Sequence, residues 1–368
     1  MTLIFVVIAM ALVFEYINGF HDTANSIATI VGTRVLSPRQ AVVMAAAMNL
    51  IGALWGTAVA TTIASGLVDP RVVTQQVLIC ALLAAIIWNL VTWRAGLPSS
   101  SSHALVGGLV GAALAAARSW SVVIWSVPDA THWYPNKGVL WKVIIPMFAS
   151  PLAGFVLGFL VMGLLYALLR NCKPRTVNAV FGKAQIASAM SMGFMHGTND
   201  AQKTMGIIAL ALAAATANGR LDNLPAWLWF LRVEQPAPGQ TLPIAVWIKV
   251  MCAVVMAAGT AAGGWRIIKT LGHKMVRLHP VNGFAAETSA AAIIGLCSHF
   301  GIPVSTTQNV AVSIMGVGAA KRFSALKWTI IERMVWAWLL TLPVSAVIAY
   351  WVVRLVHALG YAEFSGMV

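Results

Sequence analysis

The sequence predicts an all-α polytopic membrane protein with about ten crossings, arranged as two inverted five-segment repeats with broken or re-entrant helices near the midplane. Composition, recurring apolar segments and duplicated motifs support this fold class. Of 368 residues, 60% are hydrophobic and 9% are charged, whereas a soluble globular chain carries about 25% charged residues. This composition excludes a soluble enzyme, a disordered regulator and a secreted disulfide scaffold.

Segments that can supply a spanning helix, which needs about 20 largely apolar residues, recur along the chain. The first apolar run, Thr2–Tyr16, lacks a basic start and a small-residue cleavage site, so we expect a retained helix and not a signal peptide. Gly, Pro and Asn interrupt several segments, which predicts broken helices. The predicted segments are Thr2–Thr33, Gln40–Ile63, Val72–Trp93, Pro98–Ala117, Gly138–Leu169, Ala184–Ala217, Thr241–Trp265, Gly283–Phe300, Pro303–Ala320 and Trp328–His357.

The net charge of +14 has two interpretations: a nucleic-acid-binding surface, or basic loops retained in the cytoplasm by the positive-inside rule. No basic stripe lies outside the apolar segments, so we predict basic loops and no nucleic-acid partner. Most Lys and Arg residues fall on one side if the N-terminus lies outside. We therefore expect a multi-pass protein of the cell (inner) membrane, surrounded by lipid, with both termini periplasmic or extracellular.

Two motifs recur in the same order in the two halves of the chain. Asn18-Gly-Phe-His-Asp22-Thr-Ala-Asn25 matches His196-Gly-Thr-Asn-Asp200-Ala-Gln-Lys203, and Gly96-Leu-Pro98-Ser-Ser-Ser-Ser-His103 matches Gly301-Ile-Pro303-Val-Ser-Thr-Thr-Gln308. Because each half holds an odd number of segments, the second copy must be inverted. This predicts transmembrane repeats over residues 1–177 and 178–368. Inverted repeats are typical of secondary transporters, whose substrate binds near the midplane.

The first motif places Asp22 and Asp200 within apolar segments, where an ionised carboxylate costs several kcal/mol unless it is paired. One interpretation is an interfacial position or a structural salt bridge; the other is a cation or proton site. Each aspartate lies among amides and glycines, which we expect to break the helix and expose carbonyl oxygens that suit hard cations. Lys203 replaces Asn25 in the second copy, and it either neutralises Asp200 or fills a cation subsite with a fixed charge.

Other titratable side chains lie near these motifs. His21 and His196 flank the aspartates as proton relays, or as core or metal-contacting histidines. Glu287 is a third buried acid without an acidic counterpart in the first half. Glu15 is expected near the membrane interface.

The second motif suits an anion. A proline before a run of hydroxyls starts a helix with Ser or Thr at the N-cap, and a helix N-terminus binds anions. We expect two such starts, at 99–102 and 305–307, to enter from opposite faces and converge on one oxyanion. The alternative is that these residues only cap re-entrant helices. An intramembrane serine hydrolase using His103 is disfavoured, because the duplicate carries Gln308 and the chain has no G-x-S-x-G motif.

Together, the four motifs resemble the signatures of the PiT inorganic phosphate transporters, most of all the bacterial low-affinity Pit-type permeases, from about Glu15 to Arg333. The resemblance implies secondary active import of phosphate by alternating access, with no enzymatic activity and no cofactor. For Pit-type relatives it implies proton symport, often of a neutral complex of phosphate with a divalent metal such as Mg²⁺. Such pairing lowers the desolvation cost of the anion. Sodium-coupled phosphate symport and a sulfate permease of the same fold remain alternatives, and a homodimer is compatible with the resemblance.

The resemblance also assigns site residues by motif match. It implies phosphate contacts at Ser100, Ser101, Ser102, Ser305, Thr306, Thr307 and Gln308. By the same match, cation or proton coupling is implied at Asp22, Asn25, Asn199 and Asp200. From their buried positions we add Lys203 and Glu287 to the coupling residues, and we expect Asp22 and Asp200 to serve also as metal ligands. Glu287 matches a family glutamate whose usual N-terminal partner is Asn49 here, and this departure, with Lys203, weakens the case for sodium.

Overall fold

The computed structural model describes residues 2–127, 137–233, 242–275 and 278–360. The chain is 81% helical, and the described part contains no strand, which confirms the predicted helical class. Short 3₁₀ and π turns join the longer elements. The α-helices are α1 (Thr2–Gly32), α2 (Pro38–Ala53), α3 (Ala58–Ser65), α4 (Gln75–Ala95), α5 (Ser101–Ala117), α6 (Ile145–Leu169), α7 (Pro174–Ala217), α8 (Val246–Ala262), α9 (Trp265–Lys269), α10 (Pro280–His299), α11 (Thr306–Lys321) and α12 (Trp328–Ala358).

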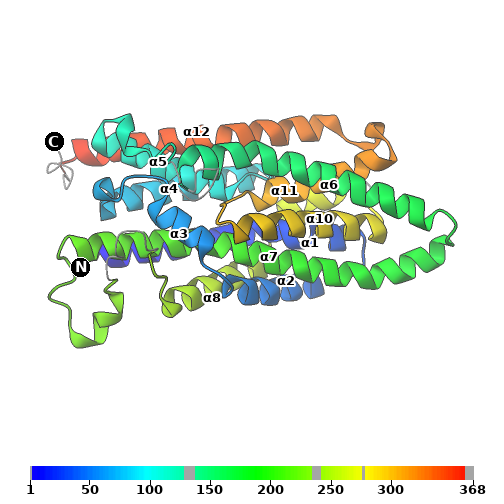
Figure 1. The fold of residues 1–368 in the computed structure, drawn as a ribbon, viewed down its shortest axis with the longest axis horizontal. Helices are drawn as coiled ribbons and strands as arrows, with labels where there is room; N and C mark the ends of the chain where they lie inside the picture. The colour runs from blue at the N-terminus through cyan, green and yellow to red at the C-terminus, as the bar shows by residue number, and fades with distance from the viewer. Residues whose placement is uncertain (1, 128–136, 234–241, 276–277, 361–368) are drawn as a thin grey trace.

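The long helices lie side by side along one axis of an elongated bundle (Figure 1). Both labelled chain ends lie at the left of that view, and the turn between α6 and α7 lies at the right. α1 therefore runs away from the end that carries the termini, whereas α7 runs back toward it. The two helices that carry the aspartate motifs are thus antiparallel.

Several helices are apolar and long enough to cross a membrane. In the described part of the chain these are α1, α4, α6 with its preceding π turn, and α12. The bent pairs α2–α3, at 69°, and α8–α9, at 58°, raise the number from 4 to 6 if each pair forms one span. The predicted segments coincide with these and the remaining helices, although Thr241 lies outside the described residues. Ten crossings and the inversion of the second half stay predictions.

A buried polar layer separates two apolar clusters. Along α1, hydrophobic side chains up to Phe14 pack in one cluster, and those from Ala24 onward pack in the other. The segment between them carries Glu15, His21 and Asp22, all buried. Because buried polar groups need partners or a ligand, this layer is where the fold places its chemistry.

Helices of one half of the chain pack against helices of the other half. α5 packs against α12, and α11 packs against α6. The backbones come so close that a Cβ on Gly111 would lie 2.1 Å from the Ala346 carbonyl oxygen, and one on Gly316 would lie 2.1 Å from that of Phe155. Gly111 and Gly316 are separated by the same sequence offset as Pro98 and Pro303. The packing is therefore duplicated along with the hydroxyl motifs.

The expectation that the aspartate motifs break their helices is wrong. α1 and α7 continue through both motifs. Their glycines instead permit close packing: a Cβ on Gly19 would lie 2.5 Å from the Met256 carbonyl oxygen, and one on Gly197 would lie 2.3 Å from that of Asn49. Small residues at such crossings let membrane helices approach closely. The bends occur instead between α2 and α3 and between α8 and α9.

Candidate functional site

The hydroxyl motifs form the two helix starts that the sequence predicts. Ser100 caps α5 and accepts a hydrogen bond from the His103 backbone N–H at 3.2 Å. Ser305 caps α11 in the same way, accepting from the Gln308 backbone N–H at 3.2 Å. Each cap satisfies one of the free amides of a first helical turn, while the other amides stay available to an anion.

These two helix starts meet inside the bundle. The Ser102 hydroxyl donates to the Val304 carbonyl oxygen at 3.2 Å, which joins the start of α5 to the residue just before the α11 cap. From this contact the helices diverge. Arg118, just after α5, shares a cavity of about 500 Å³ with Arg354 near the C-terminal end of α12, whereas Lys321, at the end of α11, shares one with Arg170 beside the α6–α7 turn. The N-termini of α5 and α11, which are the positive ends of their helix dipoles, therefore meet at the centre from opposite sides.

Asp200 is held by side chains from α7 and from α11. The Lys203 ammonium donates to Asp200 Oδ1 and to the Ser102 hydroxyl, and to the Val304 carbonyl oxygen at 3.1 Å. The Thr306 hydroxyl donates to Asp200 Oδ2 at 3.0 Å. Lys203 therefore links the second aspartate directly to both helix starts.

Asp22 occupies the matching place on α1 without a lysine. Its Oδ1 lies 2.6 Å from His21 Nδ1 and accepts from the Thr307 hydroxyl at 3.2 Å. The Asn25 amide donates to the hydroxyls of Thr306 and Thr307 at 3.1 and 2.9 Å. The start of α11 thus contacts both aspartates, one through each threonine.

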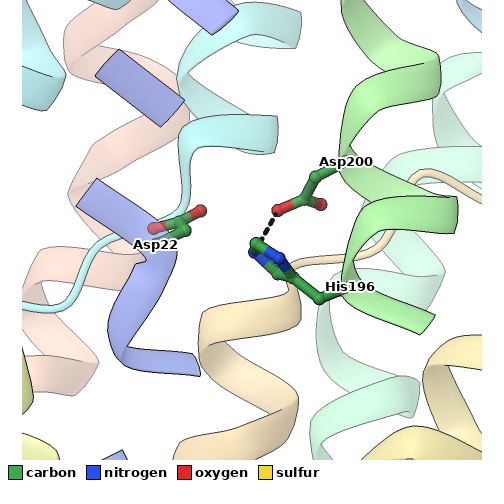
Figure 2. A group of neighbouring side chains, drawn as sticks. All are labelled: Asp22, His196 and Asp200. Carbon is green, nitrogen blue, oxygen red and sulfur yellow. Dashed lines mark ion pairs between the residues drawn. The ribbon is translucent and has the colours of Figure 1, made fainter. Parts of the chain in front are cut away.

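Asp22, His196 and Asp200 form a group with the composition of a metal site. One ligand atom of each lies within 4.8 Å of those of the other two, and all three residues are buried. Figure 2 shows His196 beside Asp200, with Asp22 facing them from α1. His196 Nε2 lies 3.1 Å from Asp200 Oδ2. Two carboxylates and an imidazole suit a divalent cation.

Each of the four motifs contains a buried polar atom that has no hydrogen-bond partner among the described residues. Leaving such an atom unpaired costs about 1–3 kcal/mol, so an unpaired atom in every motif favours a ligand-binding role over a purely structural one. These atoms are Asn25 Oδ1, Ser101 Oγ, Asn199 Oδ1 and Gln308 Oε1.

The arrangement does not suit the serine-hydrolase alternative. The Ser99 hydroxyl donates to Thr92, and the Ser102 hydroxyl donates to a carbonyl oxygen. Within the described ranges, the His103 ring Nδ1 has no hydrogen-bond partner. A serine nucleophile needs a base within hydrogen-bond reach. Among the described contacts, the ring of His103 bonds to none of these serines, and the imidazole that does lie near one, His21 Nε2 at 3.5 Å from Ser99 Oγ, is not the expected base.

Two of the predicted coupling residues lie apart from the two aspartates. The Asn199 amide donates to the Ser298 hydroxyl at 2.8 Å, at the end of α10. Glu287 accepts hydrogen bonds from Thr29 at 2.5 Å, from Gln185 at 3.1 Å, and from Ser188. Glu287 therefore belongs to a separate buried polar cluster between α1, α7 and α10.

Glu15 is buried inside the bundle, and His196 has a partner on α2 that the sequence did not indicate. Glu15 is 0% exposed, because it faces α7 inside the bundle. The seven-residue spacing from Asp22 could have revealed this, since residues i and i+7 share a helix face. His196 Nδ1 lies 3.1 Å from Asn49 Oδ1, a contact between helices that no sequence pattern indicated.

The model of the phosphate transporter family matches residues 18–349. The chain belongs to the phosphate transporter family. A "Probable low-affinity inorganic phosphate transporter" of Mycobacterium bovis is 42% identical over 358 residues, which cover 97% of this chain and 78% of that protein. One of the same name from Bacillus subtilis is 40% identical over 355 residues, covering 95% and 97%.

The family also has a counterpart among solved structures. "The sodium-dependent phosphate transporter" matches 97% of this chain and 100% of its own chain with a TM-score of 0.77 and 23% identity, which shows a shared fold. These findings confirm the resemblance drawn from the four motifs. The family consists of transporters, so the chain is not an enzyme.

Proposed function

We propose that the chain imports inorganic phosphate by proton-coupled symport with alternating access, and that the anion travels as a complex with a divalent cation such as Mg²⁺. The observation that carries this proposal is the meeting of two capped helix starts with two buried aspartates. Hydrogen-bond donors of the helix starts and acceptor carboxylates of the aspartates then lie together in one buried site. That combination suits a complex of an anion with a cation better than a free anion.

The anionic part of the cargo is assigned to the helix starts. Free backbone amides at the beginning of α5 and α11, with the hydroxyls of Ser101, Ser102, Thr306 and Thr307, offer donors to phosphate oxygens. Gln308 adds an amide in the first turn of α11. The Thr306 and Thr307 hydroxyls now donate to the aspartates and would turn toward the anion when it binds.

The cationic part of the cargo is assigned to Asp22, His196 and Asp200, whose ligand atoms lie close together. Lys203 already supplies one positive charge to Asp200, where the first half has Asn25. Because the Lys203 ammonium already pairs with Asp200, fewer transported cations are needed to neutralise the two aspartates than if both carboxylates were unpaired. This supports proton coupling over sodium coupling.

Replacing either aspartate by the isosteric amide tests the proposal. In proteoliposomes, Asp22→Asn and Asp200→Asn are expected to abolish gradient-driven uptake of radiolabelled phosphate, since each removes a charge that faces the cargo. Asp222→Asn is the matched control, because Asp222 pairs with Arg232 at the exposed surface. Uptake at the wild-type rate by either buried-site variant would contradict the proposal.

A further inference from the structure

Glu15 is a buried carboxyl group that the phosphate site does not use. It lies on α1, two helical turns before Asp22, and none of its surface is exposed. Its Oε2 accepts a hydrogen bond from the Thr204 hydroxyl on α7. Its Oε1 has no hydrogen-bond partner within the described part of the chain. One oxygen is thus held by α7, and the other is left for a proton.

Among the described residues, Lys203 is the one cation that acts on the Glu15 carboxyl group. The charged groups that act on it from α7 are Asp200 and Lys203, and the group that faces it from α8 is the Cys252 thiol. The part of α4 between Gln75 and Trp93 contains no acidic or basic side chain.

Lys203 does not neutralise a carboxylate at Glu15. Its ammonium has three N–H donors, and all three are engaged by Asp200, Ser102 and the Val304 carbonyl oxygen. A negative charge on Glu15 would therefore be unpaired and close to a second negative charge, which is costly inside a membrane protein. The neutral acid is the form that suits this conformation.

From this geometry we infer that Glu15 is the binding site of the transported proton, separate from the cargo site; the inference rests on the proposed proton symport. A proton from the external water binds Glu15 Oε1, which converts the carboxylate into the neutral acid. The same O–H bond breaks when the group opens to the cytoplasmic water, so one proton crosses in each cycle.

The position of Thr204 explains how proton release would be tied to the cargo. Thr204 directly follows Lys203 and lies four residues after Asp200 on the unbroken helix α7. In this proposal, a movement that carries Asp200 on α7 away from Asp22 on α1 also carries Thr204, whose hydrogen bond to Glu15 then breaks. The proton and the phosphate then leave in the same conformational step.

The test is Glu15→Gln in proteoliposomes, with potassium and valinomycin clamping the voltage. Glutamine keeps the shape of the neutral acid and can still accept from Thr204, but it cannot release a proton. With a gradient of about one pH unit, each coupled proton supports an about tenfold accumulation of phosphate. We expect this accumulation to fall to about one in the variant, while exchange of radiolabelled for unlabelled phosphate at equal pH continues. Glu332→Gln, at an exposed position of α12, is the control and is expected to retain both activities.

The outcomes separate this inference from the proposed function. Accumulation by Glu15→Gln at the wild-type level overturns the inference alone. Loss of exchange together with accumulation also overturns it, because Glu15 would then serve the structure or the cargo site. If the wild-type protein accumulates phosphate with a sodium gradient and not with a proton gradient, the proposed proton symport itself is wrong.

Discussion

Lys203 is the side chain that most clearly distinguishes the two aspartate motifs. In the first half, the hydrogen bonds of the Asn25 side chain to described residues go to the two threonines at the start of α11. In the second half, Lys203 contacts Asp200, Ser102 and the Val304 carbonyl oxygen. A single substitution between repeats thus replaces an amide with a fixed positive charge, and the two aspartates are no longer equivalent.

Removing this charge tests its role. Lys203→Met leaves Asp200 buried without its cation, and breaking such a pair costs about 3–5 kcal/mol. We therefore expect a lower melting temperature in detergent and loss of phosphate uptake. Lys183→Met, at an exposed position of the same helix, should change neither. Wild-type uptake by the Lys203 variant would contradict the assigned role.

Ser101 offers a cleaner test of the anion site, because its hydroxyl has no protein partner in the described structure. Ser101→Ala should leave stability unchanged. A hydrogen bond to a charged group is worth about 1.5–3 kcal/mol, so the KM for phosphate should rise about ten- to hundredfold. The control is Ser345→Ala, since among the described residues the hydroxyl of that buried serine donates only to carbonyl oxygens of its own helix. An unchanged KM would remove Ser101 from the site.

At the scale of elements, α7 holds the site together through close packing at its glycines. Gly197 lies against the α2 backbone beside His196, whereas a Cβ on Gly182, in the same helix, would meet nothing within 4 Å. Among the glycines of α7, Gly197 is therefore one that the fold requires, whereas Gly182 is one that it does not.

This contrast predicts opposite effects for the same substitution. Gly197→Ala should push α2 from α7, lower the melting temperature and impair uptake, because the added Cβ would lie 2.3 Å from the Asn49 carbonyl oxygen. Gly182→Ala should keep uptake and raise stability by up to about 1 kcal/mol through helix propensity. Thermal unfolding in detergent measures both, and equal melting temperatures would show that the α2–α7 contact is not tight.

The elements themselves were largely predictable, because hydropathy and capping are local properties. Pro98 and Pro303 before hydroxyl runs gave the starts of α5 and α11 correctly. The contact of Glu15 with Thr204 was not predictable, since it depends on how α1 docks against α7. In the sequence, the glycines of the aspartate motifs resemble helix breaks, because the backbones that require them, in α2 and α8, are distant in sequence.

At the scale of the whole molecule, the ends of the chain and the α6–α7 turn lie at opposite ends of the bundle (Figure 1). Cys172 in this turn is exposed, whereas Cys80 and Cys252 are buried and Cys297 is partly buried. The excess of basic residues predicts that this turn is cytoplasmic. A membrane-impermeant maleimide should therefore label inside-out vesicles and not right-side-out vesicles, and Cys172→Ser should lose the label. Labelling of right-side-out vesicles would reverse the predicted orientation.

The central claim is that phosphate enters with a proton and a divalent cation. Uptake of radiolabelled phosphate by wild-type proteoliposomes, under an imposed proton or sodium gradient, each with and without Mg²⁺, tests it most directly. We expect accumulation with the proton gradient, stimulation by Mg²⁺ and no competition from excess sulfate. Accumulation driven by sodium alone and indifferent to Mg²⁺ would contradict the claim.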